Sequence, residues 1–266
     1  MKIPFYQVDA FTVSPFKGNP AAVILLEKAR NEAWMQSVAS EMNLSETAFL
    51  FAEKDGYKLR WFTPSMEVEL CGHATLASAH ILFEFGFYEP DEHITFYTKS
   101  GLISASSQNG TIELDMPRRD PIAIEKDPEI EALLGVSSVA MAKYGTSLLL
   151  LELETAQMVS DFQPNFTKIN LLNYQDLLIT AHEGQRFDFV SRFFSPKTGI
   201  YEDPVTGMAH CSLAPYWAAR LGKTEFHAYQ ASKRGGELWV RLGEDRVYLG
   251  GKAVTVFQGD ILHQKE

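Results

Sequence analysis

Cysteine is scarce in this chain: Cys71 and Cys211 are the only two in 266 residues. So few cysteines exclude a small scaffold held together by disulfides, and they favour a reducing compartment. Apolar runs such as the four leucines at residues 148–151 are far shorter than the roughly 20 residues that span a membrane. The first ten residues also lack the apolar core of a signal peptide. We therefore expect a cytoplasmic protein without a membrane partner.

Clustered positive charge is missing as well. The chain has 24 Lys and Arg against 34 Asp and Glu, a net charge of −10 at pH 7. Nucleic acid binding needs a clustered basic face, so we expect no nucleic-acid partner. The sequence also contains no dinucleotide fingerprint, no phosphate-binding loop and no G-x-S-x-G motif. What remains is a globular enzyme or binding protein, long enough for two domains.

Two stretches of the sequence share one design, a glycine that opens an apolar helix. Residues 203–211 read Asp-Pro-Val-Thr-Gly-Met-Ala-His-Cys, and apolar residues then recur at helical spacing to Leu221. Residues 69–75 read Glu-Leu-Cys-Gly-His-Ala-Thr, and a second apolar helix follows to about Gly86. The start of such a helix presents unpaired backbone N–H groups and the positive end of its dipole. A small polar ligand can be held there.

The two helix starts lie at equivalent places in the two halves of the chain. Gly72 and Gly207 are 135 residues apart (207 − 72), close to half of 266. An aromatic pair, a hydroxyl residue and a proline precede each helix, at residues 61–64 and 193–196. We interpret this as two halves of one design, with the two helix starts facing each other across a cleft.

The rest of the chain predicts short strands separated by turns. Strands are expected near residues 4–11, 22–26, 48–52, 57–62, 94–98, 102–107, 111–116, 139–144, 147–153, 177–182, 187–194, 225–232, 237–242, 246–250 and 254–257. Further helices are expected at residues 32–42 and 128–134. The proline-bracketed residues 117–121 are the best candidate boundary. The pattern predicts an α+β fold with two sheet-rich halves, each wrapped on a dominant helix.

Three residues are candidates for chemistry. Glu46 enters a strand between polar neighbours and beside an apolar run, so a carboxylate partly removed from water can act there as a general base. His73 falls in the first turn of a helix, where its ring can reach the cleft and the dipole favours the neutral form. Asp203 stands just before the other helix start. The alternatives are an exposed turn carboxylate, a histidine bonded to backbone and a helix-capping carboxylate.

The cysteines suggest two other kinds of site. Cys71 at a helix start can be a thiol of low pKa. The second helix has no matching thiol at its start, because the equivalent position is Thr206. Cys211 lies about a turn further into that helix and is expected in the core. A zinc site from Cys71, His73, His210 and Cys211 is not expected, because the spacings fit no usual ligand pattern.

Several motifs, taken together, resemble the phenazine biosynthesis PhzF-like family. They are Tyr-Gln-Val-Asp-Ala-Phe at residues 6–11, Gly-Asn-Pro at 18–20, Leu-Ser-Glu-Thr-Ala-Phe at 44–49, Arg-Trp-Phe-Thr-Pro at 60–64, Leu-Cys-Gly-His-Ala-Thr at 70–75, Asp-Pro-Val-Thr-Gly at 203–207, and Gln230, Ser232 and Arg-Gly-Gly at 234–236. They follow one another in order along nearly the whole chain.

The resemblance implies a diaminopimelate-epimerase-like fold. Two pseudo-symmetric lobes are then expected, each a mostly antiparallel sheet wrapped around a central helix. The N-terminal lobe would take residues 1–117 and be completed by a C-terminal strand at 258–266, and the second lobe would take residues 118–257. The family is commonly dimeric and needs no cofactor, so the resemblance implies a homodimer without cofactor or metal.

The resemblance also implies an isomerase acting on a small amino or hydroxy carboxylic acid. Its founding activity moves a proton between ring carbons of trans-2,3-dihydro-3-hydroxyanthranilate. Glu46 then corresponds to the acid and base, and His73 and Asp203 to groups that hold the substrate and shuttle protons. The substrate-binding residues would be Asn19, Cys71, Gly72, Thr206, Gly207 and Met208.

One position departs from the family pattern. Met208 stands where the family often has serine, so a hydroxyl contact to the substrate carboxylate is lost or moves to backbone N–H groups. Two other functions stay open: an epimerase or dehydratase that uses Cys71 as its base, and a binding protein for small acids that has no catalytic activity.

Overall fold

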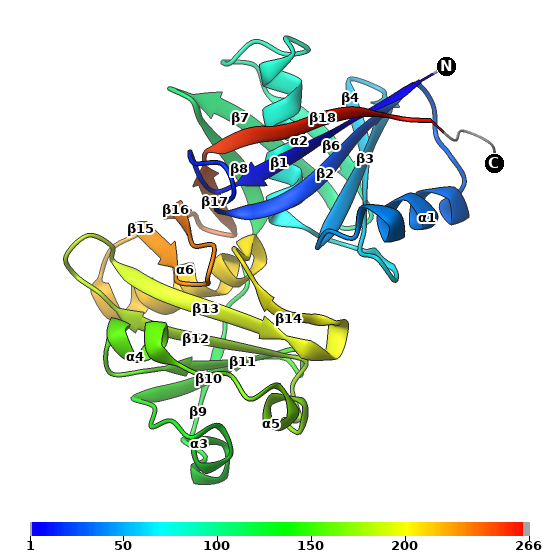
Figure 1. The fold of residues 1–266 in the computed structure, drawn as a ribbon. Helices are drawn as coiled ribbons and strands as arrows, with labels where there is room; N and C mark the ends of the chain where they lie inside the picture. The colour runs from blue at the N-terminus through cyan, green and yellow to red at the C-terminus, as the bar shows by residue number, and fades with distance from the viewer. Residues whose placement is uncertain (1, 263–266) are drawn as a thin grey trace. The chain divides into compact units, whose positions relative to one another are not determined.

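The computed structural model describes residues 2–262 (Figure 1). The chain forms two compact units. The first takes the residues up to Met116 and those from Tyr248 onward, and the second takes Pro117–Val247. None of the helices in the described part of the chain is long and apolar enough to cross a membrane.

The first unit is a mixed sheet with two helices. Its strands are β1 (Ile3–Ala10), β2 (Asn19–Leu26), β3 (Glu46–Glu53), β4 (Gly56–Phe62), β5 (Glu67–Val68), β6 (Ile94–Thr98), β7 (Gly101–Gln108), β8 (Thr111–Pro117) and β18 (Ala253–Ile261), and its helices are α1 (Glu32–Met42) and α2 (Gly72–Glu84). Antiparallel pairs join β1 to β18 and β2, β3 to β4, β4 to β5, and β6, β7 and β8 in turn. The pairs β2–β3 and β4–β6 are parallel.

Helix α2 is the centre of this unit. It packs against β1, β2, β3, β7 and β18 (Figure 1). Ten of its 13 residues are buried, because alanine, leucine and isoleucine occupy every side of the helix, as expected for a helix surrounded by a sheet. Helix α1 covers the outer side of the sheet, where Trp34 and Met35 pack with Phe49 and Phe62.

The second unit repeats this plan with more helices. Its strands are β9 (Ile122–Ile124), β10 (Ala140–Tyr144), β11 (Leu148–Glu152), β12 (Asp176–His182), β13 (Phe189–Ser195), β14 (Ile200–Asp203), β15 (Glu225–Gln230), β16 (Gly236–Leu242) and β17 (Arg246–Gly251), which ends in the first unit. Its helices are α3 (Pro128–Leu134), α4 (Ala156–Asp161), α5 (Phe166–Asn170), the 3-10 turn η1 (Pro196–Thr198) and α6 (Gly207–Leu221). Strands β11–β12 and β13–β15 are parallel.

Side-chain alternation gives this sheet two buried faces. On one face, Trp217 of α6 stacks on Phe189 of β13 with ring centroids 5.7 Å apart, and its Nε1–H donates to Thr180 Oγ1 at 3.1 Å. On the other face, Leu177 and Ile179 pack with apolar residues of the short helices α3, α4 and α5 (Figure 1). Helix α6 therefore has the same role in this unit as α2 has in the first.

The structure departs from the expected elements at a few places. Strands β5, β9 and β14 were not predicted, and neither were the two short helices α4 and α5. The strands expected at 254–257 and 258–266 are one strand, β18, which pairs with β1 from Ile3↔Ile261 to Ala10↔Ala253; residues 263–266 lie outside the described part. The first unit also includes residues 248–257, whereas the family resemblance predicts these residues in the second lobe. Leu221, the last residue of the predicted apolar spacing, is half-buried at the end of α6.

Candidate active site

The beginning of α2 gathers one group of polar side chains. Asn19 and Glu46 open the parallel neighbours β2 and β3, so both lie at the same edge of the sheet. Cys71 and His73 lie at the start of the helix that packs against these two strands. Parallel pairing and the position of α2 thus bring together residues as far apart in the sequence as Asn19 and His73, which are 54 positions apart.

His73 is the centre of this group. Its Nε2 lies 3.2 Å from Glu46 Oε2, and its Nδ1 lies 3.1 Å from Asn19 Nδ2 and 3.5 Å from Cys71 Sγ. The two atoms of the His73–Glu46 contact are at ion-pair distance, although their orientation falls short of hydrogen-bond geometry. All four residues are buried, with Glu46 8% and His73 4% exposed.

The contact with the Asn19 amide determines which nitrogen of His73 carries the proton when the ring is neutral. As placed, its Nδ2–H donates to His73 Nδ1, which must then carry a lone pair, so the neutral ring has its proton on Nε2. That nitrogen lies 3.2 Å from Glu46 Oε2, at ion-pair distance. The ring is therefore close enough to the carboxylate to exchange a proton with it.

The pKa of His73 is raised well above its usual value. Burial lowers it, but the negative charges of Cys71 as a thiolate and of Glu46 outweigh burial. This direction is opposite to the one expected from the helix start, which did not include a buried carboxylate 3.2 Å from the ring.

Cys71 is a thiol rather than a thiolate near neutral pH. Burial and the charge of Glu46 raise its pKa to about 11, against a smaller lowering by His73. The low-pKa thiol considered from its position at a helix start is thus not found. Since the thiol is neutral near pH 7, the charge that acts on His73 there is that of Glu46.

Glu46, Cys71 and His73 also have the donor types of a metal site. Each offers one ligand atom, and these atoms lie within 4.8 Å of one another. Carboxylate, thiolate and imidazole are ligands that zinc accepts. The cysteine and histidine spacings considered in the sequence did not include Glu46, which joins the group only through the fold.

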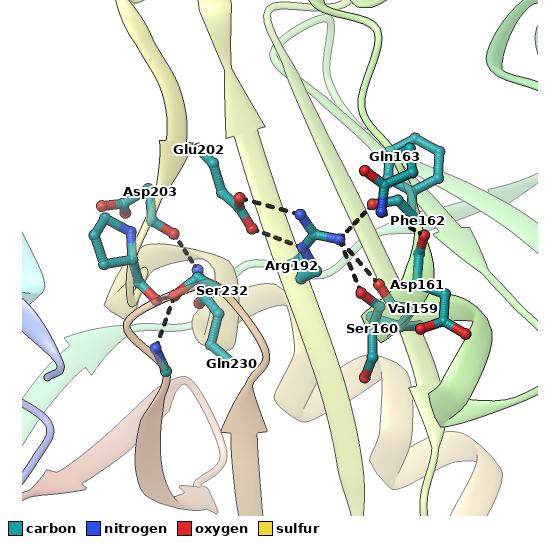
Figure 2. A network of polar contacts seen from close by, with 12 residues as sticks. Val159, Ser160, Asp161, Phe162, Gln163, Arg192, Glu202, Asp203, Gln230 and Ser232 are labelled. Atoms are coloured by element: carbon teal, nitrogen blue, oxygen red, sulfur yellow. Dashed lines mark hydrogen bonds and ion pairs between the residues drawn. The ribbon is translucent and has the colours of Figure 1, made fainter.

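A second polar group precedes α6 in the other unit. Asp203 ends β14 and accepts a hydrogen bond from Thr206 Oγ1 at 2.5 Å. The fully buried Gln230 holds the same turn: its Nε2 donates to Asp203 O at 2.7 Å (Figure 2), and its Oε1 accepts from Thr206 N–H at 2.8 Å. The backbone between Asp203 and Gly207 is therefore fixed by side chains of the following strand.

The starts of α2 and α6 differ from those of the other α-helices. Asn31, Asp127, Thr155 and Asn165 cap α1, α3, α4 and α5 by accepting hydrogen bonds from backbone N–H groups. Cys71 and Thr206, the caps of α2 and α6, make no such bond. The first N–H groups of these two helices, including those of Gly72, Gly207 and Met208, thus have no side-chain cap, and an anion is a suitable partner for them.

The structure brings the predicted residues together in two sets. Glu46, His73, Cys71, Asn19 and Gly72 lie around the start of α2, and Asp203, Thr206, Gly207 and Met208 lie at the start of α6. Gln230 entered the family resemblance but not the predicted site. No local pattern in the sequence marks it, because its partners are more than 20 residues away.

Comparison with known proteins places the chain in a family. A family model described as phenazine biosynthesis-like protein, PhzC-PhzF, matches residues 8–259. The chain belongs to this family. The resemblance stated from the motifs is therefore confirmed.

Relatives and solved structures agree with this assignment. An uncharacterized isomerase of Halalkalibacterium halodurans is 50% identical over 98% of this chain and 99% of its own length. An uncharacterized isomerase of Pseudomonas aeruginosa is 46% identical, with the same coverage of 98% and 99%. A crystal structure of a PhzF family protein from Enterococcus faecalis is 43% identical and has a TM-score of 0.94, covering 99% of this chain and 100% of that one. The expectation of an isomerase agrees with the names of these relatives.

The fold is shared more widely. A probable proline racemase of Agrobacterium radiobacter matches with a TM-score of 0.69 over 98% of this chain and 93% of its own, at 11% identity. At that identity the likeness concerns the fold alone. The predicted α+β fold is confirmed by both structures.

Proposed function

We propose that the protein is an isomerase that moves a carbon-bound proton within a small carboxylic acid and uses Glu46 as its acid and base. The observation that carries this proposal is the buried contact of Glu46 Oε2 with His73 Nε2 at 3.2 Å. A buried carboxylate with one oriented oxygen has the equipment for removing a proton from carbon and returning it to another carbon.

His73 serves this reaction by orienting Glu46. Its Nδ1 is held by Asn19, and its Nε2 lies 3.2 Å from the carboxylate. Because the pKa of His73 is raised, its ring readily holds a proton beside the Glu46 carboxylate. The net charge of the His73–Glu46 pair can thus change as Glu46 accepts and releases the substrate proton.

In the proposed reaction, the uncapped starts of α2 and α6 supply electrostatic stabilisation. Negative charge develops on the substrate when the proton leaves carbon, and preorganised N–H groups stabilise such charge. Asp203 holds the amino or hydroxyl group of the acid. Its position is set by Thr206 and Gln230.

Met208 affects the choice of substrate rather than the proton transfer. It is the second residue of α6 and has no hydroxyl to donate. A substrate carboxylate at this helix start must therefore be bound by backbone N–H groups. We expect a substrate that differs from trans-2,3-dihydro-3-hydroxyanthranilate.

The test is incorporation of deuterium into carbon. The wild-type protein is incubated in D₂O with a panel of small amino and hydroxy acids, including trans-2,3-dihydro-3-hydroxyanthranilate, and carbon-bound exchange is followed by NMR. Catalysed exchange in at least one compound is the expected result. An acid that binds in calorimetry without any exchange or conversion would instead indicate the non-catalytic binding protein.

A second candidate function uses Cys71 as the base, because its Sγ lies 3.5 Å from His73 Nδ1. An imidazole at this distance can accept the thiol proton. The pKa of about 11 opposes this function in the resting protein, so we place Glu46 first.

A further inference from the structure

A buried ion pair joins two strands ahead of α2. Arg60 on β4 donates from Nε to Glu67 Oε1 and from Nη2 to Glu67 Oε2, both at 2.7 Å. Its guanidinium also lies over the ring of Phe62, 5.1 Å from the centroid. The two side chains are 17% and 8% exposed. Burial raises the pKa of Glu67, but Arg60 and Lys99 outweigh this and lower it, so Glu67 is a carboxylate at neutral pH.

The same ion pair occurs ahead of α6 in the other unit. Arg192 on β13 donates from Nε to Glu202 Oε1 at 2.7 Å and from Nη2 to Glu202 Oε2 at 3.1 Å (Figure 2). Its guanidinium lies over the ring of Phe194, again 5.1 Å from the centroid. The side chains are 9% and 20% exposed.

The two pairs occupy equivalent positions in the internal repeat. Each arginine comes directly before an aromatic pair, a hydroxyl residue and a proline. Each glutamate comes five residues before the glycine that opens the helix (72 − 67 and 207 − 202). The arginine-to-glutamate spacing is seven residues in the first unit and ten in the second (67 − 60 and 202 − 192), since η1 lengthens the second turn.

The strands that carry the glutamates need such support. Strand β5 has two residues, and it pairs only as Trp61↔Val68 and Phe62↔Glu67. Strand β14 has four, and its register shifts between Phe193 and Ser195. So few ladder hydrogen bonds hold a strand weakly. A bidentate arginine–carboxylate pair adds two bonds of fixed geometry across the same two strands.

In each unit, a serine also binds the segment between the glutamate strand and the helix. Ser100, after β6, donates to Glu69 O, and Ser232, after β15, donates to Pro204 O, both at 2.8 Å. Each acceptor is three residues before its helix (72 − 69 and 207 − 204). Figure 2 shows the serine contact beside the Arg192–Glu202 pair. The connection into each helix is thus held at the same two points in both units.

Strand alternation connects the ion pair in the second unit to the candidate site. Consecutive residues of a strand point to opposite faces. Glu202 therefore faces Arg192 on one side of β14, while Asp203 faces the other side and accepts from Thr206. Moving Glu202 would tilt the same short strand that carries Asp203.

We propose that Arg60–Glu67 and Arg192–Glu202 are a duplicated pair of Arg–Glu clamps that position the starts of α2 and α6 for the reaction. This inference rests on the proposed function for its catalytic consequence. The four residues act through the connections that they hold, so they are positioning residues. The first clamp sets the separation of His73 from Glu46, and the second sets Asp203 and the turn to Gly207.

The test replaces each clamp arginine by lysine, which keeps the charge but cannot form two parallel hydrogen bonds to one carboxylate. In Arg60→Lys, the pKa of His73, read from the pH dependence of its imidazole ¹⁵N shifts, falls toward 6.5 because His73 moves away from Glu46. In Arg192→Lys, exchange of the Thr206 amide hydrogen accelerates relative to that of Leu213 in the same helix. Where a substrate is known, kcat falls about 10- to 100-fold in each variant.

The matched control is Arg220→Lys. Arg220 pairs with Glu152 at 2.7 Å near the end of α6, away from its first turn, so this variant changes neither the His73 titration nor the relative Thr206 exchange. If both clamp variants behave like Arg220→Lys, the pairs contribute to stability alone and the proposal is wrong. The titration and the amide exchange need no substrate, so they test the clamps even if the protein proves not to be an isomerase.

Discussion

At the scale of single residues, the site depends on one sharp turn before Asn19. Gly18 has φ +63°, and a Cβ added there would lie 2.1 Å from Ala10 O. Both the backbone conformation and the space thus require glycine. The motif Gly-Asn-Pro is therefore needed for geometry as much as for the amide that binds His73.

Replacing Gly18 by alanine should damage both stability and activity. Gly86 is a matched control, because its φ is +71° but nothing lies within 4 Å of an added Cβ. We expect Gly86→Ala to lower the free energy of unfolding by about 1 kcal/mol, the cost of the left-handed conformation alone. Gly18→Ala should cost at least about 2 kcal/mol, since it adds a backbone clash, and should slow proton exchange because Asn19 moves. Urea unfolding measures both. Equal losses in the two variants would contradict this account of Gly18.

At the scale of elements, α6 carries a histidine that is buried without charge. His210 is fully buried, and its Nδ1–H donates to Thr206 O at 2.8 Å. Burial lowers its pKa to about 4, against a smaller raising effect of that hydrogen bond. The unfolded chain, with a histidine pKa near 6.5, therefore binds this proton more readily than the folded chain below that pH.

The sign of the resulting pH dependence follows from linkage. Protonation of His210 favours the unfolded chain from about pH 6.5 down to about pH 4, so stability falls as the pH falls through this window. We expect wild type to lose about 2 to 3 kcal/mol more than His210→Gln between pH 7 and 4.5. Urea unfolding at the two pH values measures this, with the exposed His182→Gln as the control. The same loss in His210→Gln as in wild type would show that His210 does not carry the effect.

Long and strongly patterned elements could be predicted from the sequence, whereas the shortest could not. Helix α2 and helix α6 follow from apolar spacing and an opening glycine. Strands β5 and β14 could not be predicted, because with two and four residues they are too short to show a periodic pattern. The Arg–Glu clamps were not predicted either, because these short strands carry their glutamates. Their sequence signal is nevertheless present: both aromatic pairs are preceded by arginine, and a glutamate stands five residues before each glycine.

At the scale of the whole molecule, the order of motifs along the chain predicted the family and the fold. Which residues meet around His73 could not be derived from spacing, because Asn19, Glu46 and His73 come from three separate elements. Asn19 and Glu46 come together only because β2 and β3 are parallel, and His73 joins them because α2 packs against these strands. The expected homodimer stays a prediction, which sedimentation analysis would check.

The central claim is that Glu46, rather than Cys71, moves the substrate proton. The most direct measurement is the rate of carbon-bound deuterium exchange in Glu46→Gln and Cys71→Ser, with Glu53→Gln at the other end of β3 as the control. We predict a loss of at least about 10²-fold in Glu46→Gln, less than about tenfold in Cys71→Ser, and the wild-type rate in Glu53→Gln. Exchange that survives in Glu46→Gln and disappears in Cys71→Ser would contradict the account and assign the base to the thiol.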